Sequence, residues 1–387
     1  MVTFKKVTTK GREAPGVGGV SPPDQQIFTR YLYNINDVQH SLLLSLVTSN
    51  SDFLESLFWT SELYYSGFKD NIWELIWKIY YDFYAINNPK YEKSITKFYR
   101  KWKKSNKIKY LLKSISLIHH TKIKNVSVFY LRILNPTSST KKYSGRTPNW
   151  IKQLELEKSE KSFIRALHDK NLHNIKYYLS KIENNFERTY EIIIKYFIII
   201  HGFNLRQKSR SDVPYKNKKH ILYGIICYLL IDIGTINRKV ILKKITKDDI
   251  NFVINTNKKI NPIYKTLTIN RLFSVSANIG YFNIKHTNDC KDKLWFHWEY
   301  FIRNCPLWEE RINKYKGKFN EEKKKIEFIN DDLLEEFYDN FGFEPDEQNL
   351  ECQNKSIGKL ECGSLIDFIS LLNIKTQLLF PTISINY

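Results

Sequence analysis

Residues 36–89 constrain the fold most, because three helical patterns joined by short turns follow one another there. In the third pattern, the apolar residues recur at the spacing of one helical face: Ile72, Leu75, Ile76, Ile79, Tyr80 and Phe83. Trp73, Trp77 and Tyr84 form an aromatic stripe beside that face. A helix that is apolar over so much of its circumference is usually packed between neighbours. The stretch therefore predicts an antiparallel helical layer with an aromatic core.

Each of the three helices has a start signal, an Asn or Asp followed three residues later by Gln or Glu. The pairs are Asn36 with Gln39, Asp52 with Glu55, and Asn71 with Glu74. The second helix is expected to close at Gly67, because glycine readily adopts the left-handed conformation that ends many helices. Its inner face is predicted to carry Leu54, Leu57, Phe58 and Tyr65.

The aromatic side chains of this layer allow two interpretations. An aromatic box could hold a nucleic-acid base or a cation. Large aromatic residues at helical spacing also supply most of the buried area in a helical core. We favour the core interpretation, which predicts that Trp73 and Trp77 are buried.

The remaining chain is also patterned mainly as helices. We predict a mostly α fold of stacked helical hairpins, irregular and helical-repeat-like, with a small mixed α+β cap at the C-terminal end. No clean internal repeat is found. The expected parts are a flexible leader (1–28), an N-terminal helical layer (31–134), a linker loop (135–149), a second helical part (150–256) and a mixed C-terminal part (257–387).

Several local expectations follow from these patterns. Residues 150–167 are expected as one helix, and the Ile-rich residues 190–200 as a buried helix rather than a strand. Pro306 is well placed as the first residue of a helix. Further expected elements are short strands within 266–281, a small strand at 325–328, an acidic helix at 331–340 and a last helix at 364–372.

The composition permits a large hydrophobic core, but because lysine is frequent throughout the chain, a basic patch is weaker evidence of function. The 387 residues could form one large domain or two, and 42% of them are hydrophobic. Lys, Asn, Ile and Tyr are frequent, which is typical of an AT-rich genome. The net charge of +21 is uneven. Residues 87–150 hold sixteen Lys or Arg and one acid, whereas residues 320–387 hold six bases and fourteen acids.

The basic segment 87–150 is the best candidate for a functional surface. Its candidate nucleic-acid-binding residues are Lys97, Arg100, Lys101, Trp102, Lys103, Lys104, Lys107, Lys141, Lys142 and Arg146. They resemble a phosphate-binding stripe in which Trp102 stacks on a base. The alternatives are a surface that docks onto acidic protein and a merely solvated basic face in a Lys-rich chain.

Signatures of catalysis and of metal binding are missing from the sequence. Phosphate-binding loops, dinucleotide-binding glycine motifs, zinc-protease motifs and nucleophile elbows do not occur. His119 and His120 are adjacent and should point to different helix faces, and His168 and His173 are five apart, so neither pair has zinc-ligand spacing. We therefore expect no catalytic residues, no metal and no cofactor.

Cysteine usage and hydropathy suggest where the protein works. The five cysteines are Cys227, Cys290, Cys305, Cys352 and Cys362. Their number is odd and they form no Cys-x-x-Cys pair, which favours a reducing, intracellular compartment. The longest apolar run, residues 221–231, is too short to span a bilayer, so no membrane span is expected.

Five phrases together resemble uncharacterised proteins of large nucleocytoplasmic DNA viruses, the mimivirus relatives in particular. They lie at 30–46, 61–68, 75–85, 305–312 and 325–348. The resemblance implies a viral origin and a place in the host cytoplasm or the virion, and it carries no residue roles. Our hypothesis is a non-enzymatic structural or interaction (scaffold) protein with protein partners. The alternatives are a nucleic-acid-binding protein that uses residues 87–150 and an enzyme without a recognisable motif.

Overall fold

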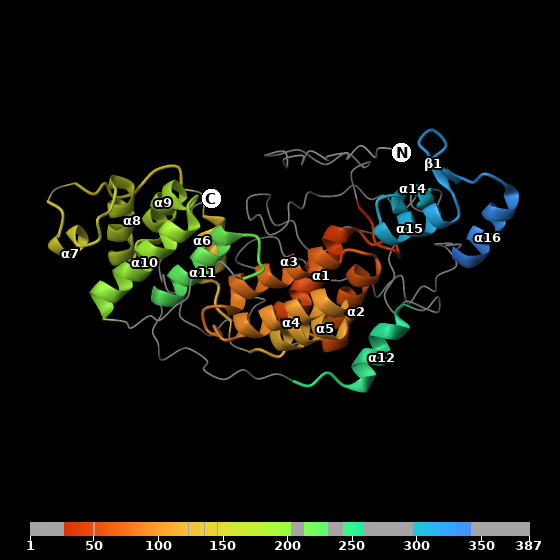
Figure 1. The fold of residues 1–387 in the computed structure, drawn as a ribbon, viewed down its shortest axis with the longest axis horizontal. Helices are drawn as coiled ribbons and strands as arrows, with labels where there is room; N and C mark the ends of the chain where they lie inside the picture. The colour runs from red at the N-terminus through yellow and green to blue at the C-terminus, as the bar shows by residue number, and fades with distance from the viewer. Residues whose placement is uncertain are drawn as a thin grey trace, which may run out of the picture.

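The structure is a computed structural model that describes residues 27–48, 51–122, 124–134, 136–144, 146–202, 213–230, 243–257 and 297–341. Of these residues, 66% are helical, and they contain one two-stranded antiparallel sheet. The predicted fold class, mostly α with a small mixed C-terminal part, is therefore confirmed. Figure 1 shows a central group of helices in red and orange, flanked by a yellow-green group at one end and a blue group at the other.

The central group is the predicted aromatic layer. Its helices are α1 (Ile35–Val47), α2 (Phe53–Tyr65), α3 (Lys69–Ile79), α4 (Tyr91–Ser105) and α5 (Lys109–His119). Helix α2 packs against α1, α3 and α5, and α4 packs against α5. Consecutive helices joined by short turns must run antiparallel, so each buries its apolar stripe against its neighbour.

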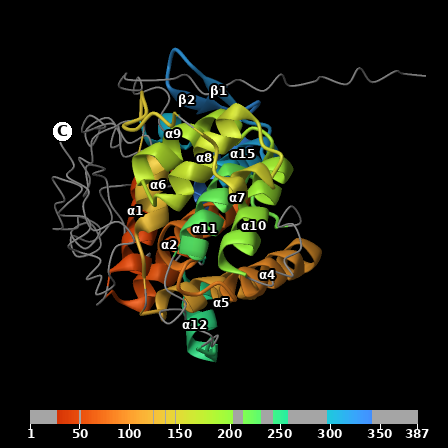
Figure 2. The same cartoon turned by 90° about the vertical axis from the view of Figure 1, so that its left-hand side faces the viewer.

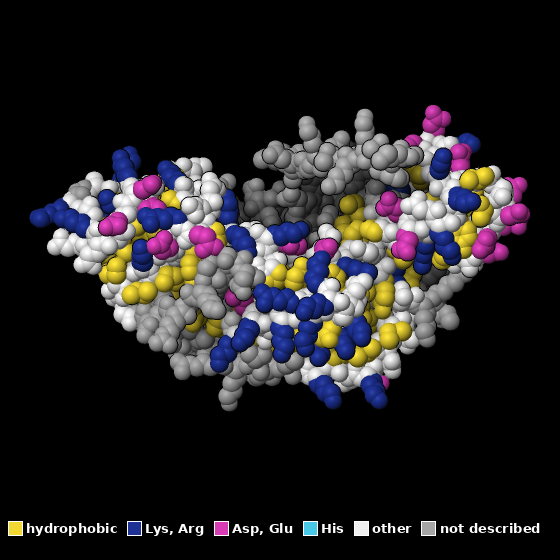
Figure 3. Space-filling model, viewed as in Figure 1, with side chains coloured by type: hydrophobic (Ala, Val, Ile, Leu, Met, Phe, Trp, Pro, Cys, Tyr) yellow, Lys and Arg dark blue, Asp and Glu magenta, His cyan; other side chains and the backbone are white. Residues whose placement is uncertain are grey.

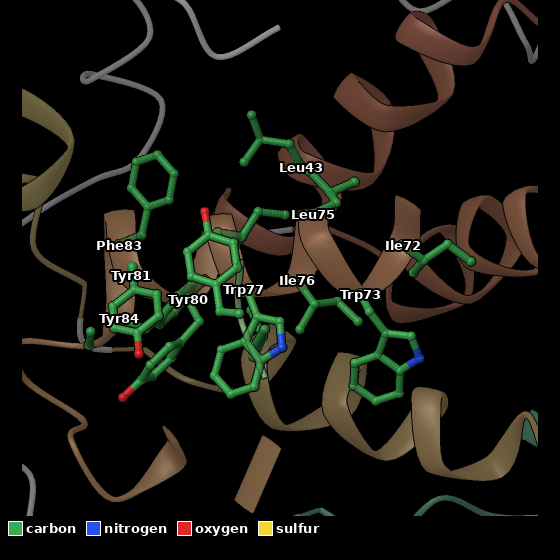
Figure 4. Close-up of a cluster of buried hydrophobic side chains, with 14 of the residues drawn as sticks. Leu43, Ile72, Trp73, Leu75, Ile76, Trp77, Tyr80, Tyr81, Phe83 and Tyr84 are labelled. Carbon is green, nitrogen blue, oxygen red and sulfur yellow. The ribbon is translucent and has the colours of Figure 1, made fainter. Parts of the chain in front are cut away.

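The core of this layer is aromatic, as predicted. Trp73 and Trp77 are 2% and 1% exposed. Figure 4 shows the Trp77 ring beside those of Tyr80 and Tyr81, which follow on the same chain segment, and the Trp73 ring apart from them. Trp77 also stacks on Tyr215 from the second helical part, with ring centroids 6.2 Å apart. Trp77 therefore joins the layer to its neighbour, whereas Trp73 packs within the layer against Tyr99 and Trp102.

Two of the predicted helix starts need comment. Asp52 caps α2 as predicted, because its side chain accepts a hydrogen bond from the backbone N–H of Leu54. The cap of α1 is Asn34 and not Asn36, whose N–H donates to Asn34 Oδ1 at 2.9 Å. Leu54 is 41% exposed, so its predicted place on the inner face is wrong.

The third helix begins earlier than predicted. Helix α3 starts at Lys69, and Phe68 occupies the N-cap position without a side-chain hydrogen bond. Asn71 is therefore inside the first turn and is not a cap. The reason is Gly67, whose φ of +96° ends α2 and turns the chain so sharply that the next helix starts two residues later.

Helix α3 continues into a π-helix, η2 (Tyr80–Tyr84). The backbone N–H of Ala85 donates to the carbonyl of Tyr80 at 2.8 Å, which is the wider i→i+5 pattern. All five residues of η2 are buried, including Asp82. The wide turn thus carries aromatic side chains and one carboxylate inward within five consecutive residues.

The second helical part packs against η2. Its helices are α7 (Asn149–Lys152), α8 (Lys158–His168), α9 (Leu172–Ile182), α10 (Phe186–His201) and α11 (Lys218–Leu230), and they are joined by α6 (Ser127–Ile133) from the predicted range of the N-terminal layer. Helix α8 pairs with α9, and α11 packs against α6, α10 and η2. Residues 190–200 are helical, as predicted, but the helix is buried on one side only, since Ile198 and Ile199 are 42% and 38% exposed. The single helix predicted at 150–167 is two helices, since Glu155 has φ +49° and Glu157 starts α8 with a capping box.

The C-terminal part combines short helices with a hairpin. Its elements are α14 (Trp298–Ile302), α15 (Pro306–Lys314), β1 (Lys318–Asn320), β2 (Lys325–Glu327) and α16 (Asp331–Phe341). Helix α12 (Lys247–Asn255), at the end of the predicted second helical part, packs against α2. The strands pair antiparallel with Phe319 opposite Ile326. Pro306 is the first residue of α15, as predicted. The leader up to residue 26, the strands predicted within 266–281 and the helix predicted at 364–372 lie outside the described residues.

Gly67 also lies where α2 meets α15, and we expect Gly67→Ala to lower the free energy of unfolding by about 2–4 kcal/mol. An alanine would strain the backbone at φ +96°, and its Cβ would lie 2.6 Å from Pro306 Cβ. Gly202→Ala is the matched control, because Gly202 has φ +63° but no atom within 4 Å of its Cβ position. It should lose only about 1 kcal/mol. Equal losses in urea denaturation would show that the α2–α15 contact contributes nothing.

Candidate functional site

Helices α4 and α5 present a basic outer face, which we call the α4–α5 face. Helix α4 buries Tyr91, Ile95 and Phe98 at helical spacing and turns its Lys and Arg outward. The exposed bases among the predicted site residues are Lys97, Arg100, Lys101, Lys103, Lys104 and Lys107. Figure 3 shows Lys and Arg side chains gathered over these two helices. The structure thus brings six predicted residues onto one continuous surface.

Trp102 does not belong to that surface. It is 4% exposed, and its ring packs against that of Trp73 with centroids 5.6 Å apart. The predicted stacking role is therefore wrong, because the indole ring lies on the apolar side of α4. In the sequence, Trp102 lies between Arg100 and Lys103, and we therefore assigned it to the basic surface, although helical spacing places it on the buried stripe of α4.

Tyr110 is the aromatic residue around which the lysines of this face gather. The Nζ atoms of Lys101, Lys109 and Lys113 lie 5.8, 5.2 and 6.0 Å from the centre of its ring. These distances are within cation–π range, so the ring helps to hold three like charges together. Lys103 is anchored in another way, by an exposed ion pair with Asp70 at 3.0 Å.

The predicted loop bases Lys141, Lys142 and Arg146 do not extend the α4–α5 face. They are exposed, but their loop runs beside α7, α8 and α9, away from α4 and α5 in both views (Figures 1 and 2). Lys141 is paired with Asp169 at 2.9 Å. The sequence places these bases in one basic segment, but the intervening helix α6 leads the chain to the other end of the molecule.

Helix α16 carries the opposite charge, at the far end of the molecule from α7 (Figure 1). Its acidic side chains are exposed: Asp331, Asp332, Glu335, Glu336 and Asp339. Two apolar side chains lie beside them, Ile329 at 72% exposure and Leu334 at 38%. Acidic residues in the first turn also favour the helix dipole. The result is an acidic surface that includes two exposed apolar side chains, which we call the α16 face.

A buried polar cluster, which the sequence did not predict, lies where η2 meets α6 and α11. Asp82 and His220 are both fully buried, and His220 Nε2 lies 2.7 Å from Asp82 Oδ1. Arg132 binds the same carboxylate, with Nε at 3.1 and 3.2 Å from its two oxygens. On the other side of the imidazole, Tyr215 Oη lies 2.9 Å from His220 Nδ1.

Burial determines the protonation of this cluster. Burial raises the pKa of the Tyr215 phenol, so the phenol stays protonated. Its O–H donates a hydrogen bond to His220 Nδ1. His220 Nε2 then carries the hydrogen that Asp82 accepts, and burial lowers the pKa of this histidine, which stays neutral. Burial alone would raise the pKa of Asp82, but Arg132 and His220 together lower it to about 2. The cluster is therefore an Arg–Asp ion pair with a neutral histidine.

A pocket of about 510 Å³ opens beside this cluster. Its walls include Glu74 and Lys78 of α3, Arg132 of α6, and Tyr215 and Lys219 near the start of α11. Burial and the neighbouring Arg132 lower the pKa of Lys78 to about 7. The lining residues lie far apart in the sequence and share no spacing. The available signal was a lone Asp within the aromatic run of residues 80–84.

The histidine pairs do not form metal sites. The rings of His119 and His120 lie 4.9 Å apart, so the prediction that they point to different helix faces is wrong. Helix α5 ends at His119, and His120 therefore leaves the helical geometry. His168 packs on Trp150, whereas His173 is hydrogen-bonded to the carbonyl of Ser138. In the described part of the chain, no three His, Cys, Asp or Glu converge as a metal site.

Comparison with known proteins finds no match to a family model, to a curated protein or to a solved structure. The resemblance to viral proteins therefore stays a prediction. Within the described residues, no helix combines the length and the apolar character needed to cross a bilayer. Cys227 and Cys305, the cysteines in this part of the chain, are buried free thiols.

Proposed function

We propose that this chain is a non-enzymatic assembly (scaffold) protein whose copies associate through the α4–α5 face of one copy and the α16 face of the next. The observation that carries the proposal is the separation of opposite charges on rigid helices. Six exposed bases lie on the α4–α5 face, and five exposed acids lie on α16. Complementary charged surfaces steer association and fix its register.

The geometry of such an assembly follows from where the two faces lie. They occupy different regions of the same chain (Figure 3), so the contact between two copies joins unlike surfaces. Contacts of this head-to-tail kind generate rings or open filaments rather than closed twofold dimers. Ile329 and Leu334, exposed among the acids, supply apolar area that a lasting contact needs. A structural role in a virion, as the sequence resemblance implies, fits this form of association.

The second candidate function is binding of nucleic acid through the same α4–α5 face. The number of exposed bases favours it, because each phosphate that is neutralised releases counterions. Two observations count against it. Trp102 is buried, which removes the stacking residue, and Lys141, Lys142 and Arg146 lie elsewhere, which shortens the basic track.

The proposal is tested by charge reversal and sedimentation velocity. Replacing Lys101, Lys103, Lys104 and Lys107 by Glu should give a monomer at low salt, since two acidic faces repel. Replacing Asp331, Asp332 and Glu335 by Lys should do the same, since two basic faces repel. A mixture of the two variants should associate again, because each face then meets its opposite. The wild-type oligomer should dissociate in 1 M salt, because the Debye length there is about 3 Å and the attraction between the two charged faces is screened.

The competing outcomes are distinct. A wild-type chain that is monomeric at low salt, or a mixture of the variants that does not associate, would overturn the assembly proposal. A gel shift with short DNA and RNA at two salt concentrations tests the second candidate. Retarded bands that disappear at higher salt and in the α4–α5 variant would identify nucleic acid as the partner. Lys152→Glu, at an exposed site on α7, controls for a charge reversal that lies outside both faces.

A further inference from the structure

Lys78 presents its amine to a pocket rather than to an open surface. It lies near the C-terminal end of α3, is half-buried, and lines the pocket of about 510 Å³ beside Asp82. Ligand pockets occupy roughly 300–1,000 Å³, so a small molecule can reach this amine. The other two cations of the lining are held by carboxylates, since Arg132 lies 3.0 Å from Asp82 and Lys219 lies 3.2 Å from Glu183. These two side chains act as members of ion pairs, and the chemistry of Lys78 has to be considered separately.

Glu74 stands one helical turn before Lys78 on α3. Residues at this spacing share a helix face, with about 5–6 Å between their Cβ atoms, and both residues line the pocket. Burial raises the pKa of the Glu74 carboxyl group, although Lys216, 4.0 Å away, opposes the shift. The carboxyl group therefore keeps its proton to a higher pH than usual. One wall of the pocket thus places an amine beside a proton donor.

The amine of Lys78 is nucleophilic near neutral pH. Burial lowers its pKa to about 7, although Asp82 acts in the opposite direction. About half of the amine is then uncharged at pH 7, whereas a lysine with the ordinary pKa of about 10.4 keeps less than about a thousandth of its amine uncharged. Desolvated lysines in pockets react with carbonyl compounds for this reason. Leu75 and the rings of Tyr215 and Tyr223 add apolar surface to the lining.

We propose that Lys78 is a covalent binding site for a small aldehyde with an apolar or aromatic body, which the amine captures as an imine. The nitrogen lone pair forms the C–N bond while the carbonyl π electrons move to oxygen, which takes a proton from Glu74. The nitrogen gives one proton back to the Glu74 carboxylate, and the hydroxyl group then leaves as water with the last proton of the nitrogen. One amine and one aldehyde thus give one imine and one water. The site lies outside the α4–α5 face and does not rest on the assembly proposal.

Reductive trapping of the full chain at pH 7 tests this proposal, with benzaldehyde as the probe. Sodium cyanoborohydride is added in excess, so that imine formation limits the rate, and peptide mass spectrometry measures the labelling of each lysine. Lys78 should be labelled at least about tenfold faster than Lys122, an exposed lysine outside the pocket, because far more of its amine is uncharged. In concentrated urea the two rates should become equal. Equal rates in the folded chain, or a difference that persists in urea, would overturn the proposal.

Lys124 is the control that separates the pocket from the effect of burial alone. Burial lowers the pKa of Lys124 to about 8, but its side chain is outside the pocket lining. It is 6% exposed, and its Nζ donates to the carbonyl of Val47. Lys124 should therefore be labelled no faster than Lys122. If Lys124 is labelled as fast as Lys78, access through the pocket does not determine the reaction.

Glu74→Gln tests the proton donor without removing the amine. It should slow the labelling of Lys78 about tenfold or more, since glutamine cannot exchange a proton with the carbonyl oxygen, and it should leave the labelling of Lys122 unchanged. Urea denaturation of the variant checks that it is folded. Unchanged labelling of Lys78 in the folded variant would contradict the role assigned to Glu74.

Discussion

Arg30→Ala should lower the free energy of unfolding by about 3–5 kcal/mol, the range expected when one partner of a buried ion pair is removed. The side chains of Arg30 and Glu62 are 4% and 0% exposed, and Arg30 Nε lies 2.9 Å from Glu62 Oε2. Without the guanidinium, the Glu62 carboxylate would stay buried without its counter-ion. Urea denaturation followed by circular dichroism measures the loss.

Arg30 also connects distant parts of the chain. Its guanidinium donates to the carbonyl of Thr256 at 2.8 Å and to Asn257 Oδ1 at 2.9 Å. The control is Lys323→Ala, which breaks the exposed pair with Glu327 and should leave stability unchanged. The double variant Arg30→Met with Glu62→Leu should recover much of the loss, because it buries no charge. If Arg30→Ala and Lys323→Ala behave alike, the buried pair does not stabilise the fold.

Stability should rise with pH from acid to a maximum near about pH 9–10, above the usual range of about pH 5–8. Burial lowers the pKa of His40 to about 3, so between about pH 3 and 6.5 the unfolded chain binds a proton that the folded chain does not. Stability is therefore lost as the pH falls through this window. His119, with its pKa lowered to about 4, and buried His220 act in the same direction.

The rise continues above neutral pH because of buried lysines. Burial lowers the pKa of Lys78 to about 7 and those of Lys124 and Lys176 to about 8. Between these values and the ordinary lysine pKa, the unfolded chain again binds more protons, so stability still increases with pH. Above about pH 10 the direction reverses, because burial raises the pKa values of Tyr84 and Tyr223 and keeps them protonated in the fold.

Urea denaturation from pH 4 to pH 11 checks this profile. Lys78→Met should raise stability at pH 7 and flatten the rise between pH 7 and pH 10, since its lowered lysine pKa is then removed. The falling net charge adds to the same trend, because the chain carries +21 at pH 7 and its isoelectric point is about 9.5. A maximum between pH 5 and pH 7 would contradict the prediction.

The helical layer could be predicted from the sequence because the residues that determine each helix lie within a few positions of one another. Trp73 and Trp77 recur at helical spacing, and Asp52 is a side-chain cap that acts within three residues. The errors are also local in origin. Asn36 and Asn71 match the cap pattern, but the pattern does not say which of several neighbouring Asn or aromatic residues starts the helix.

The candidate sites could be predicted only in part. The bases of α4 share one helix face, so their surface followed from periodicity, whereas Lys141 was assigned to it by charge alone. The Asp82–His220 contact joins residues 138 positions apart, and no spacing rule connects them. The π-helix that carries Asp82 packs against α6 and α11, and single-sequence patterns do not contain these contacts.

The contacts of Arg30 determine when the fold can be completed during synthesis. Its backbone carbonyl accepts a hydrogen bond from Trp308 Nε1, 278 residues later in the chain. At a translation rate of about 5–20 residues per second, Trp308 leaves the ribosome roughly 14–56 s after Arg30. During that interval the nascent helical layer holds the Arg30–Glu62 pair without the residues that later cover it. In each newly made chain, the N-terminal layer is thus synthesised before Trp308, the residue that completes the contacts of Arg30.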